Sequence, residues 1–224
     1  MIPVLMSWSG GKDSCFALHE LQRSGNHDVI GLLTTVTREH ARISMHGVHH
    51  RLLERQAAML GLPLFESPIS TDASNEEYEA AVAEALAEHR AAGVKTVAYG
   101  DLFLADIRAY RDRLLARNGM NALYPVWGRP TRRFVGDFIS AGFKAVIVCV
   151  DLRALDASFA GRMVDETLLN DLPIRVDPCG ENGEYHTFVF DGPNFRDPVA
   201  IAVGERIARG DFCFCDIEPS AASA

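Results

Sequence analysis

The sequence lacks the segments that would carry a protein into or out of a membrane. No window of 18 apolar residues occurs among its 224 residues, and the apolar run near the N-terminus is interrupted by Ser7 and follows no basic segment. These absences argue against secretion and against membrane spanning. We therefore expect a cytoplasmic protein with no membrane partner.

Cysteine pairs at metal-binding spacing are also missing. The five cysteines are an odd number scattered along the chain, which argues against a disulfide framework. Cys213 and Cys215 could present two thiolates on one face of a strand, but no second pair of Cys or His lies at zinc spacing nearby. A structural zinc site is therefore not expected.

Lysine is scarce and the chain is acidic. Its formal net charge is -8, which disfavours nonspecific nucleic-acid binding because a polyphosphate partner needs a basic surface. Several arginines crowd residues 108–133, and we interpret them mainly as a solvated helix face. One of them, Arg133, is nevertheless a candidate substrate contact.

Apolar and charged residues are otherwise present in ordinary proportions. At 48% hydrophobic and 23% charged residues, the chain can bury a full core as one large domain or two small ones. Strand and helix patterns alternate up to residue 150, which predicts an α/β fold with a doubly wound, mostly parallel sheet. The expected strands are 3–6, 29–36, 64–67, 96–99, 122–126 and 145–150.

After residue 150 the pattern changes to antiparallel hairpin material, with expected strands at 185–190, 200–207 and 212–217. This change predicts a smaller C-terminal subdomain of mixed α+β type. We expect a nucleotide-binding domain at 1–150, a substrate subdomain at 151–218 and a disordered tail at 219–224.

The chain is organised around a glycine turn between the first strand and the first helix. Two adjacent glycines let the backbone approach a phosphate, a lysine adds positive charge, and serines add hydroxyl donors at a helix N-terminus. A polyphosphate is the expected ligand, and a glycine-rich surface turn is the alternative. The candidate ATP-binding residues here are Ser7, Ser9, Gly10, Gly11, Lys12, Asp13 and Ser14.

Two familiar phosphate loops do not fit this turn. The Walker pattern would need a glycine at Met6 and a hydroxyl at Asp13, and the dinucleotide fingerprint would need glycines at Lys12 and Cys15. The string Ser-Gly-Gly-x-Asp-Ser instead resembles the PP-loop of the ATP pyrophosphatases, which cleave ATP between its α and β phosphates. The resemblance implies that the loop holds the pyrophosphate portion and that Asp13 is associated with Mg²⁺.

The end of the fourth strand should lie on the same rim of the sheet as this loop. There Gly100 permits a close approach of ligand, and Asp101 supplies a carboxylate that, with Asp13, is a candidate metal ligand. The alternative role for Asp101 is the N-cap of the next helix.

A second polar stretch, Asp177 to Thr187, lies in the C-terminal part. Glu181 and Glu184 could bind a cation or an amine, His186 could transfer a proton near neutral pH, and Asn182 is a candidate substrate contact. The alternative is a tight turn whose polar residues merely shape the backbone. His46, in the loop before the second helix, is a further candidate for touching substrate.

Several strings together resemble the diphthine ammonia ligase family, a branch of the ATP pyrophosphatases. They are the glycine turn, Met45-His46-Gly47 ahead of Gln56-Ala57, Tyr124-Pro125-Val126-Trp127-Gly128 and Cys179 to Thr187, and the similarity runs from Val4 to about Phe195. The resemblance implies ATP and Mg²⁺, an acyl adenylate, and attack by ammonia with release of AMP and pyrophosphate. In that branch the acceptor is the modified histidine of elongation factor 2.

The segment Asp101 to Arg108 differs from the Ser-Asp-Tyr-Gln-like string typical of that branch, and the preference for Arg over Lys indicates a bacterial-type member. We therefore predict a ligase that amidates a carboxylate of unknown identity, on a small molecule or a protein side chain. A homodimer is a further expectation. The catalytic residues would be Lys12, Asp101, Glu181, Glu184 and His186. The alternatives are an RNA-modifying enzyme of the thiolation or lysidine type and a non-catalytic ATP sensor.

Overall fold

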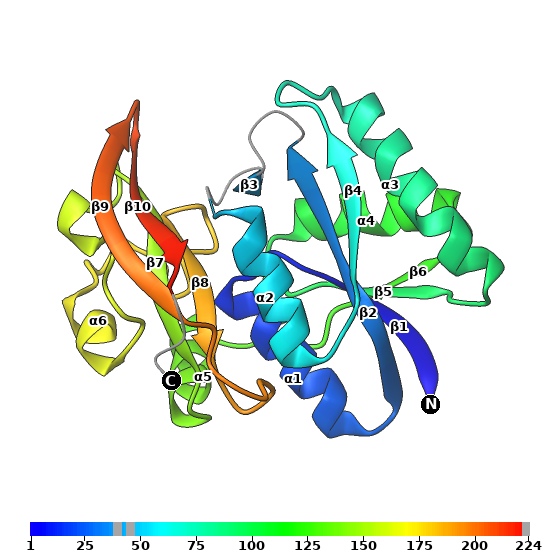
Figure 1. The fold of residues 1–224 in the computed structure, drawn as a ribbon, viewed down its shortest axis with the longest axis horizontal. Coiled ribbons are helices and arrows are strands. Elements are labelled where there is room, and N and C mark those ends of the chain that lie inside the picture. Colours follow the sequence, from blue (N-terminus) through cyan, green and yellow to red (C-terminus); the bar gives the residue numbers. More distant parts are fainter. Residues whose placement is uncertain (38–41, 44–47, 221–224) are drawn as a thin grey trace.

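The computed structural model describes residues 1–37, 42–43 and 48–220. Their strands form two sheets, and the helices α1 (Lys12–Ser24) and α2 (His50–Leu60) lie between them (Figure 1).

The first sheet is parallel apart from one short strand. Its parallel strands follow the order β4-β2-β1-β5-β6, and β3 pairs antiparallel with the end of β2. This arrangement confirms the predicted α/β fold with a doubly wound, mostly parallel sheet. The strands are β1 (Ile2–Ser7), β2 (His27–Thr37), β3 (Arg42–Ile43), β4 (Leu64–Ile69), β5 (Thr96–Ala98) and β6 (Asn121–Leu123).

Local signals set several helix ends. α1 and α2 are each followed by a left-handed glycine, Gly25 and Gly61, and α3 (Asn75–Ala91) starts with a capping box between Ser74 and Glu77. The N-cap of α4 (Ala105–Arg117) is Leu104, so the alternative role of Asp101 as an N-cap is wrong. Two residues separate Asp101 from this N-cap, so its carboxylate is available to other partners.

Side-chain alternation in β1 divides the core into two layers. Val4 and Met6 pack in a cluster that includes α1, α2 and the second sheet, whereas Leu5 packs in a cluster that includes α3 and α4. The loop that follows β1 therefore emerges between the two sheets.

The second sheet is antiparallel, in the order β8-β7-β10-β9. Its strand β7 (Lys144–Asp151) pairs with β8 and β10, so the expectation that it is the sixth strand of the parallel sheet is wrong. A fully apolar run looks the same in either sheet, because periodicity carries no information about the pairing partner. The other strands are β8 (Tyr185–Asp191), β9 (Ile201–Arg209) and β10 (Phe212–Pro219), accompanied by the helices α5 (Thr131–Ser140) and α6 (Glu166–Asp171).

The structure continues beyond residue 219, where the disordered tail was predicted to begin. Pro219 is the last residue of β10, and the Ser220 N–H donates to the Ala200 carbonyl; residues 221–224 lie outside the described part of the chain. The division into domains at residue 150 stays a prediction.

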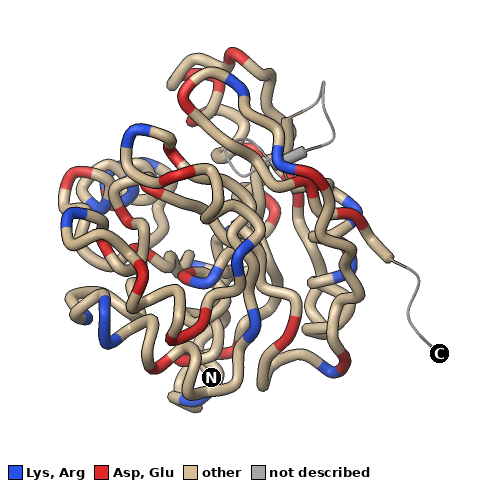
Figure 2. The backbone as a smooth tube through the Cα atoms, turned by 90° about the vertical axis from the view of Figure 1, so that its left-hand side faces the viewer, with Lys and Arg blue, Asp and Glu red and all other residues tan. Residues whose placement is uncertain are grey.

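Among the described residues, no helix is long and apolar enough to cross a membrane. Basic and acidic residues are interspersed along the backbone of both parts (Figure 2). The expectation that nucleic acid is not the partner stays a prediction.

Candidate active site

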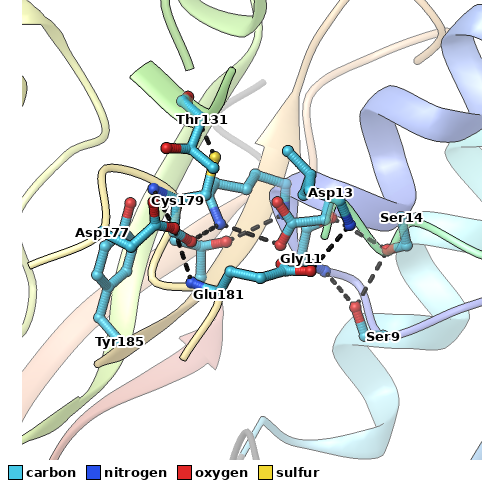
Figure 3. Close-up of polar contacts among 12 residues, drawn as sticks. Ser9, Gly11, Asp13, Ser14, Thr131, Asp177, Cys179, Glu181 and Tyr185 are labelled. Atoms are coloured by element: carbon cyan, nitrogen blue, oxygen red, sulfur yellow. Dashed lines mark hydrogen bonds and ion pairs between the residues drawn. The ribbon is translucent and has the colours of Figure 1, made fainter. Parts of the chain in front are cut away.

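The glycine loop, residues 7–14, closes on itself through hydroxyl groups (Figure 3). The Gly11 N–H donates to Ser9 Oγ at 3.3 Å, Ser9 Oγ and Ser14 Oγ are 3.1 Å apart, and Ser14 Oγ donates to the Gly11 carbonyl at 3.1 Å. Since the Ser14 proton is used on that carbonyl, the Ser9 hydroxyl donates to Ser14. The loop therefore holds its shape through its own hydrogen bonds.

Both glycines of the loop pack closely against other parts of the chain. Gly10 has a φ of 75°, and a Cβ there would lie 2.7 Å from Gln56 Oε1. A Cβ at Gly11 would lie 3.1 Å from the Thr187 carbonyl oxygen, and the Lys12 N–H donates to Thr187 Oγ1 at 3.0 Å. The start of α1 is thus fastened to β8 of the second sheet.

Lys12 is buried, with 2% of its surface exposed. Its Nζ donates to Asp13 Oδ2 at 3.0 Å and to the Cys179 carbonyl, and lies 5.1 Å from the centre of the Tyr185 ring. Burial alone would lower the pKa of Lys12, but the Asp13 carboxylate reverses that effect and raises the pKa above its usual value. The ammonium group is therefore charged at neutral pH.

Asp13 and Asp101 each have one paired and one unpaired oxygen. Asp13 Oδ2 is bound by Lys12, and Asp101 Oδ1 lies 3.2 Å from Arg111 Nη2. The other oxygens, Asp13 Oδ1 and Asp101 Oδ2, are buried without a hydrogen-bond partner among the described residues. Burial raises the pKa of both carboxyls, and the charge of Asp13 adds to the rise at Asp101.

This pair of oxygens fits a hard divalent cation. Mg²⁺ prefers oxygen ligands and is commonly held by one or two carboxylates together with substrate phosphates. No group of three or more His, Cys, Asp or Glu side chains with metal-binding geometry occurs in the described part of the chain. A cation here would therefore complete its shell with phosphate oxygens and water.

Gly100 fits closely against the backbone at the start of α1. A Cβ at this position would lie 2.6 Å from the Asp13 carbonyl carbon and 2.7 Å from the Ser14 nitrogen. The neighbour that requires a glycine here is thus the protein backbone, whereas the sequence led us to expect a ligand.

The carboxylate loop, residues 177–184, uses most of its acidic groups to hold its own shape. Asp177 Oδ2 accepts hydrogen bonds from the N–H groups of Cys179 and Glu181, each at 3.1 Å. Glu184 accepts from the Asp177 N–H, the Asn182 N–H and Asn182 Nδ2, each at 3.0 Å, and is 8% exposed. For Glu184 and Asn182 the geometry therefore favours the alternative, in which these side chains shape a tight turn and do not contact a ligand.

Glu181 is the carboxylate of this loop that faces the other acids. Its Oε1 accepts a hydrogen bond from the Leu102 N–H at 2.8 Å, which joins the loop to the segment after β5. Burial raises the pKa of Glu181 to about 6; the Leu102 N–H opposes this rise, and the charges of Asp13 and Asp101 add to it.

His186 and Cys179 are both held in their neutral forms. Burial, with a smaller effect of the Lys12 charge, lowers the pKa of His186 to about 4, so this imidazole does not titrate near neutral pH as expected. The Cys179 thiol donates to the Thr131 carbonyl at 3.3 Å, and burial raises its pKa. Neither group has the properties of a proton carrier or thiolate nucleophile at neutral pH.

Three predicted residues lie apart from this cluster or cannot be placed. Arg133 is on α5 with 79% of its side chain exposed, 3.9 Å from Asp137. Ser7 is the half-buried last residue of β1, and His46 lies outside the described residues.

Gln56 is a residue that the sequence reasoning missed. Its Nε2 donates to the carbonyls of Gly10 at 3.0 Å and Val189 at 2.5 Å, and its Oε1 accepts from Trp8 Nε1 at 3.0 Å. The side chain is fully buried and joins the glycine loop to β8. The signal was a polar residue at a position of α2 that otherwise carries Leu and Ala.

Arg111 was also missed, because it was interpreted as part of a solvated helix face. It pairs with Asp101 and lies 4.2 Å from the centre of the Tyr99 ring. Its spacing within α4 gave no sign of this partner.

Comparison with known proteins identifies two adjoining family domains in the chain. Residues 2–122 match the diphthamide synthase N-terminal domain, and residues 130–222 match the diphthamide synthase C-terminal domain. Similar proteins include the diphthine–ammonia ligases of Danio rerio, 26% identical over 93% of this chain and 90% of that protein, and of Homo sapiens, 25% identical over 93% and 86%. The ligase of Schizosaccharomyces pombe is 24% identical over 94% of this chain, which spans only 38% of that longer protein.

A solved structure also resembles the chain, a predicted subunit of a tRNA methyltransferase from Methanocaldococcus jannaschii. It superposes with a TM-score of 0.42 and 17% identity over 66% of this chain and 80% of the other.

Proposed function

Because the chain belongs to the diphthamide synthase family, we propose that it is an ATP-dependent ligase that converts a carboxylate to an amide. A carboxylate oxygen would attack the α-phosphorus of ATP and expel pyrophosphate to form an acyl adenylate. Ammonia would then attack the acyl carbon, giving the amide, AMP and a proton. The observation that carries this proposal is the meeting of Lys12, Asp13 and Asp101 at the start of α1.

The glycine loop would bind the β and γ phosphates. Anions are favoured at a helix N-terminus, and the buried, charged Lys12 would stabilise the negative charge that grows on the departing pyrophosphate. In the described state Lys12 Nζ is occupied by the Cys179 carbonyl and Asp13. ATP binding would exchange at least one of these contacts for a phosphate oxygen.

Asp13 Oδ1 and Asp101 Oδ2 would hold Mg²⁺. The ion would supply positive charge that neutralises the phosphates and helps to orient them for in-line displacement. Arg111 keeps Asp101 in place from the opposite side.

Glu181 is the carboxylate we assign to ammonia. Its pKa of about 6 keeps it mostly ionised at neutral pH, so it could hold an ammonium ion or accept a proton from it. Glu184 and Asn182 would act indirectly by shaping the loop, and the neutral His186 would supply a polar group beside the glycine loop.

The acceptor is the open part of this proposal. The relatives are named diphthine–ammonia ligases, and at about 25% identity we extend to this chain the type of reaction and leave the acceptor as a carboxylate of a small molecule or a protein side chain. We expect the reaction in the cytoplasm, in keeping with five free cysteines. A homodimer also stays a prediction.

The test is to incubate the protein with ATP, Mg²⁺, ammonia and candidate acids and to separate AMP from ADP. We expect AMP and pyrophosphate in equal amounts, and exchange of labelled pyrophosphate into ATP that requires the acid but not ammonia. Formation of ADP would contradict the proposal. ATP binding without pyrophosphate release for any acid would favour the sensor instead.

An RNA thiolation activity would require a reactive cysteine. The protonated, hydrogen-bonded thiol of Cys179 is unsuited to that role. We expect Cys179→Ser to retain AMP formation, and loss of activity in this folded variant would revive the thiolation hypothesis.

A further inference from the structure

Two arginines of α4 lie on a row of aromatic rings at the carboxyl ends of β5 and β6. The guanidinium of Arg111 is 4.2 Å from the centre of the Tyr99 ring. The guanidinium of Arg108, one turn earlier, is 4.7 Å from the Tyr124 ring and 4.6 Å from the Trp127 ring. Tyr99 and Tyr124 stack at 5.9 Å, so the two arginines share one continuous aromatic surface.

The two arginines differ in what their charge already binds. Arg111 is 3.2 Å from Asp101 and 29% exposed. Arg108 is 40% exposed, and among the described residues its guanidinium makes no hydrogen bond and one long ion pair, 3.8 Å to Asp112. Asp112 in turn accepts a hydrogen bond from the Tyr124 hydroxyl at 2.9 Å. The charge of Arg108 is therefore held in place but only weakly neutralised.

A guanidinium held against aromatic rings is prepared to bind a planar anion. The rings restrict its rotation through cation–π contacts and leave its N–H edge to form two parallel hydrogen bonds. Less conformational entropy is lost on binding when the side chain is already fixed. Carboxylates and phosphates are the ligands that match this edge.

The position of Arg108 connects it to the candidate active site. Arg111 touches both the shared aromatic surface and Asp101, and Asp101 faces Asp13 at the start of α1. An anion bound at Arg108 would lie on the same rim of the parallel sheet as the glycine loop.

We propose that Arg108 is the binding site for the carboxylate of the acceptor, with Tyr124 and Trp127 holding its guanidinium in place. This inference rests on the proposed ligase function and names the residue that recognises its second substrate. The other source of a planar or tetrahedral oxyanion is a phosphate of ATP, and the experiment separates the two.

Trp127 provides a direct signal for the test, because an anion on Arg108 would change the surroundings of its indole ring. We would titrate the full-length protein with glutarate and with inorganic phosphate at constant ionic strength and record tryptophan fluorescence. We expect a saturable change with glutarate, absent in Trp127→Phe, and binding weakened by about tenfold or more in Arg108→Gln. Arg113→Gln is the matched control, since Arg113 is an exposed arginine of the same helix, and it should bind glutarate as the parent does.

Each other outcome overturns the proposal. Equal binding of glutarate by Arg108→Gln and the parent would remove Arg108 from recognition. A saturable, Arg108-dependent change with phosphate but not with glutarate would assign the residue to ATP. The titration measures binding and needs no turnover. Its result can therefore be interpreted whether or not the protein forms AMP, and it can contradict the role of Arg108 while AMP formation supports the ligase.

Discussion

The glycine loop and the carboxylate loop meet at one site, but they satisfy their polar groups differently. The glycine loop closes a ring of hydroxyl hydrogen bonds and still leaves Asp13 Oδ1 buried without a partner among the described residues. In the carboxylate loop, the side chains of Asp177 and Glu184 accept hydrogen bonds from backbone N–H groups of the same loop. A high density of acidic residues therefore does not measure the number of available ligands, because most of these acids build the loop.

This difference implies that the two loops have different roles. The glycine loop would contribute the charge of Lys12 and the unpaired Asp13 Oδ1 to the chemistry, whereas the carboxylate loop would contribute Glu181 and holds Lys12 through the Cys179 carbonyl. Variants in each loop should therefore fail in different assays.

The largest effect should come from Lys12→Gln. We expect AMP formation to fall by about 10³-fold, or about 4 kcal/mol, because a preorganised charge in a buried site is lost where negative charge develops. Gln keeps a polar group in this site, and thermal unfolding would check that the fold persists. Turnover within tenfold of the parent would show that the charge of the glycine loop is not used.

Gln56→Leu should destabilise the connection between the glycine loop and β8. The change leaves Trp8 Nε1 and the carbonyls of Gly10 and Val189 without their buried partner, which we expect to cost about 3 kcal/mol in the free energy of unfolding by urea. The matched control is Gln22→Leu, which alters an exposed glutamine and should change stability by less than about 0.5 kcal/mol. Equal effects of the two variants would contradict the role of Gln56.

Glu184→Gln tests whether the carboxylate loop depends on its own acid. An amide replaces one accepting oxygen with a donor that faces an N–H group, so we expect a loss of about 2 kcal/mol in unfolding free energy. Glu205→Gln, on exposed β9, is the control that should be neutral. If Glu184→Gln unfolds like the parent but loses AMP formation, Glu184 would belong with the reacting groups instead.

Glu181→Gln should give the smallest change in the free energy of unfolding, and this change should depend on pH. The folded pKa of about 6 lies above the usual value for Glu, so ionisation costs stability in the folded parent as pH rises through this range. The variant avoids that cost and should be more stable than the parent by about 1 kcal/mol at pH 7.5, after allowance for partial solvent exposure, with little difference at pH 4. A stability difference that is the same at both pH values would show that Glu181 is not strained by burial.

The features that a sequence predicts best are those coded by neighbouring residues. The capping box of Ser74 and Glu77 and the stops at Gly25 and Gly61 need only local chemistry. Alternation of strands and helices was enough for the parallel sheet. The sheet that β7 joins was not predictable, because its pairing with β8 and β10 depends on residues far along the chain.

The candidate site follows the same division. The glycine loop and Asp101 were recognisable because each follows a strand on the same rim. Gln56, Thr187 and Arg111 acquire their meaning only through partners that are distant in sequence. The carboxylate loop was overestimated, since composition alone does not reveal that Glu184 binds the backbone beside it.

Gly100 has a consequence for ion selection. Its α-carbon rests directly on the main chain between Asp13 and Ser14, so an added methyl group would act as a wedge between β5 and α1. Asp13 and Asp101 lie on opposite sides of this contact between β5 and α1, and main-chain packing fixes the distance between the two elements. If Asp13 and Asp101 hold Mg²⁺ as proposed, the backbone sets the ionic radius that they accept, and Gly100→Ala should shift the preference from Mg²⁺ toward larger ions such as Ca²⁺.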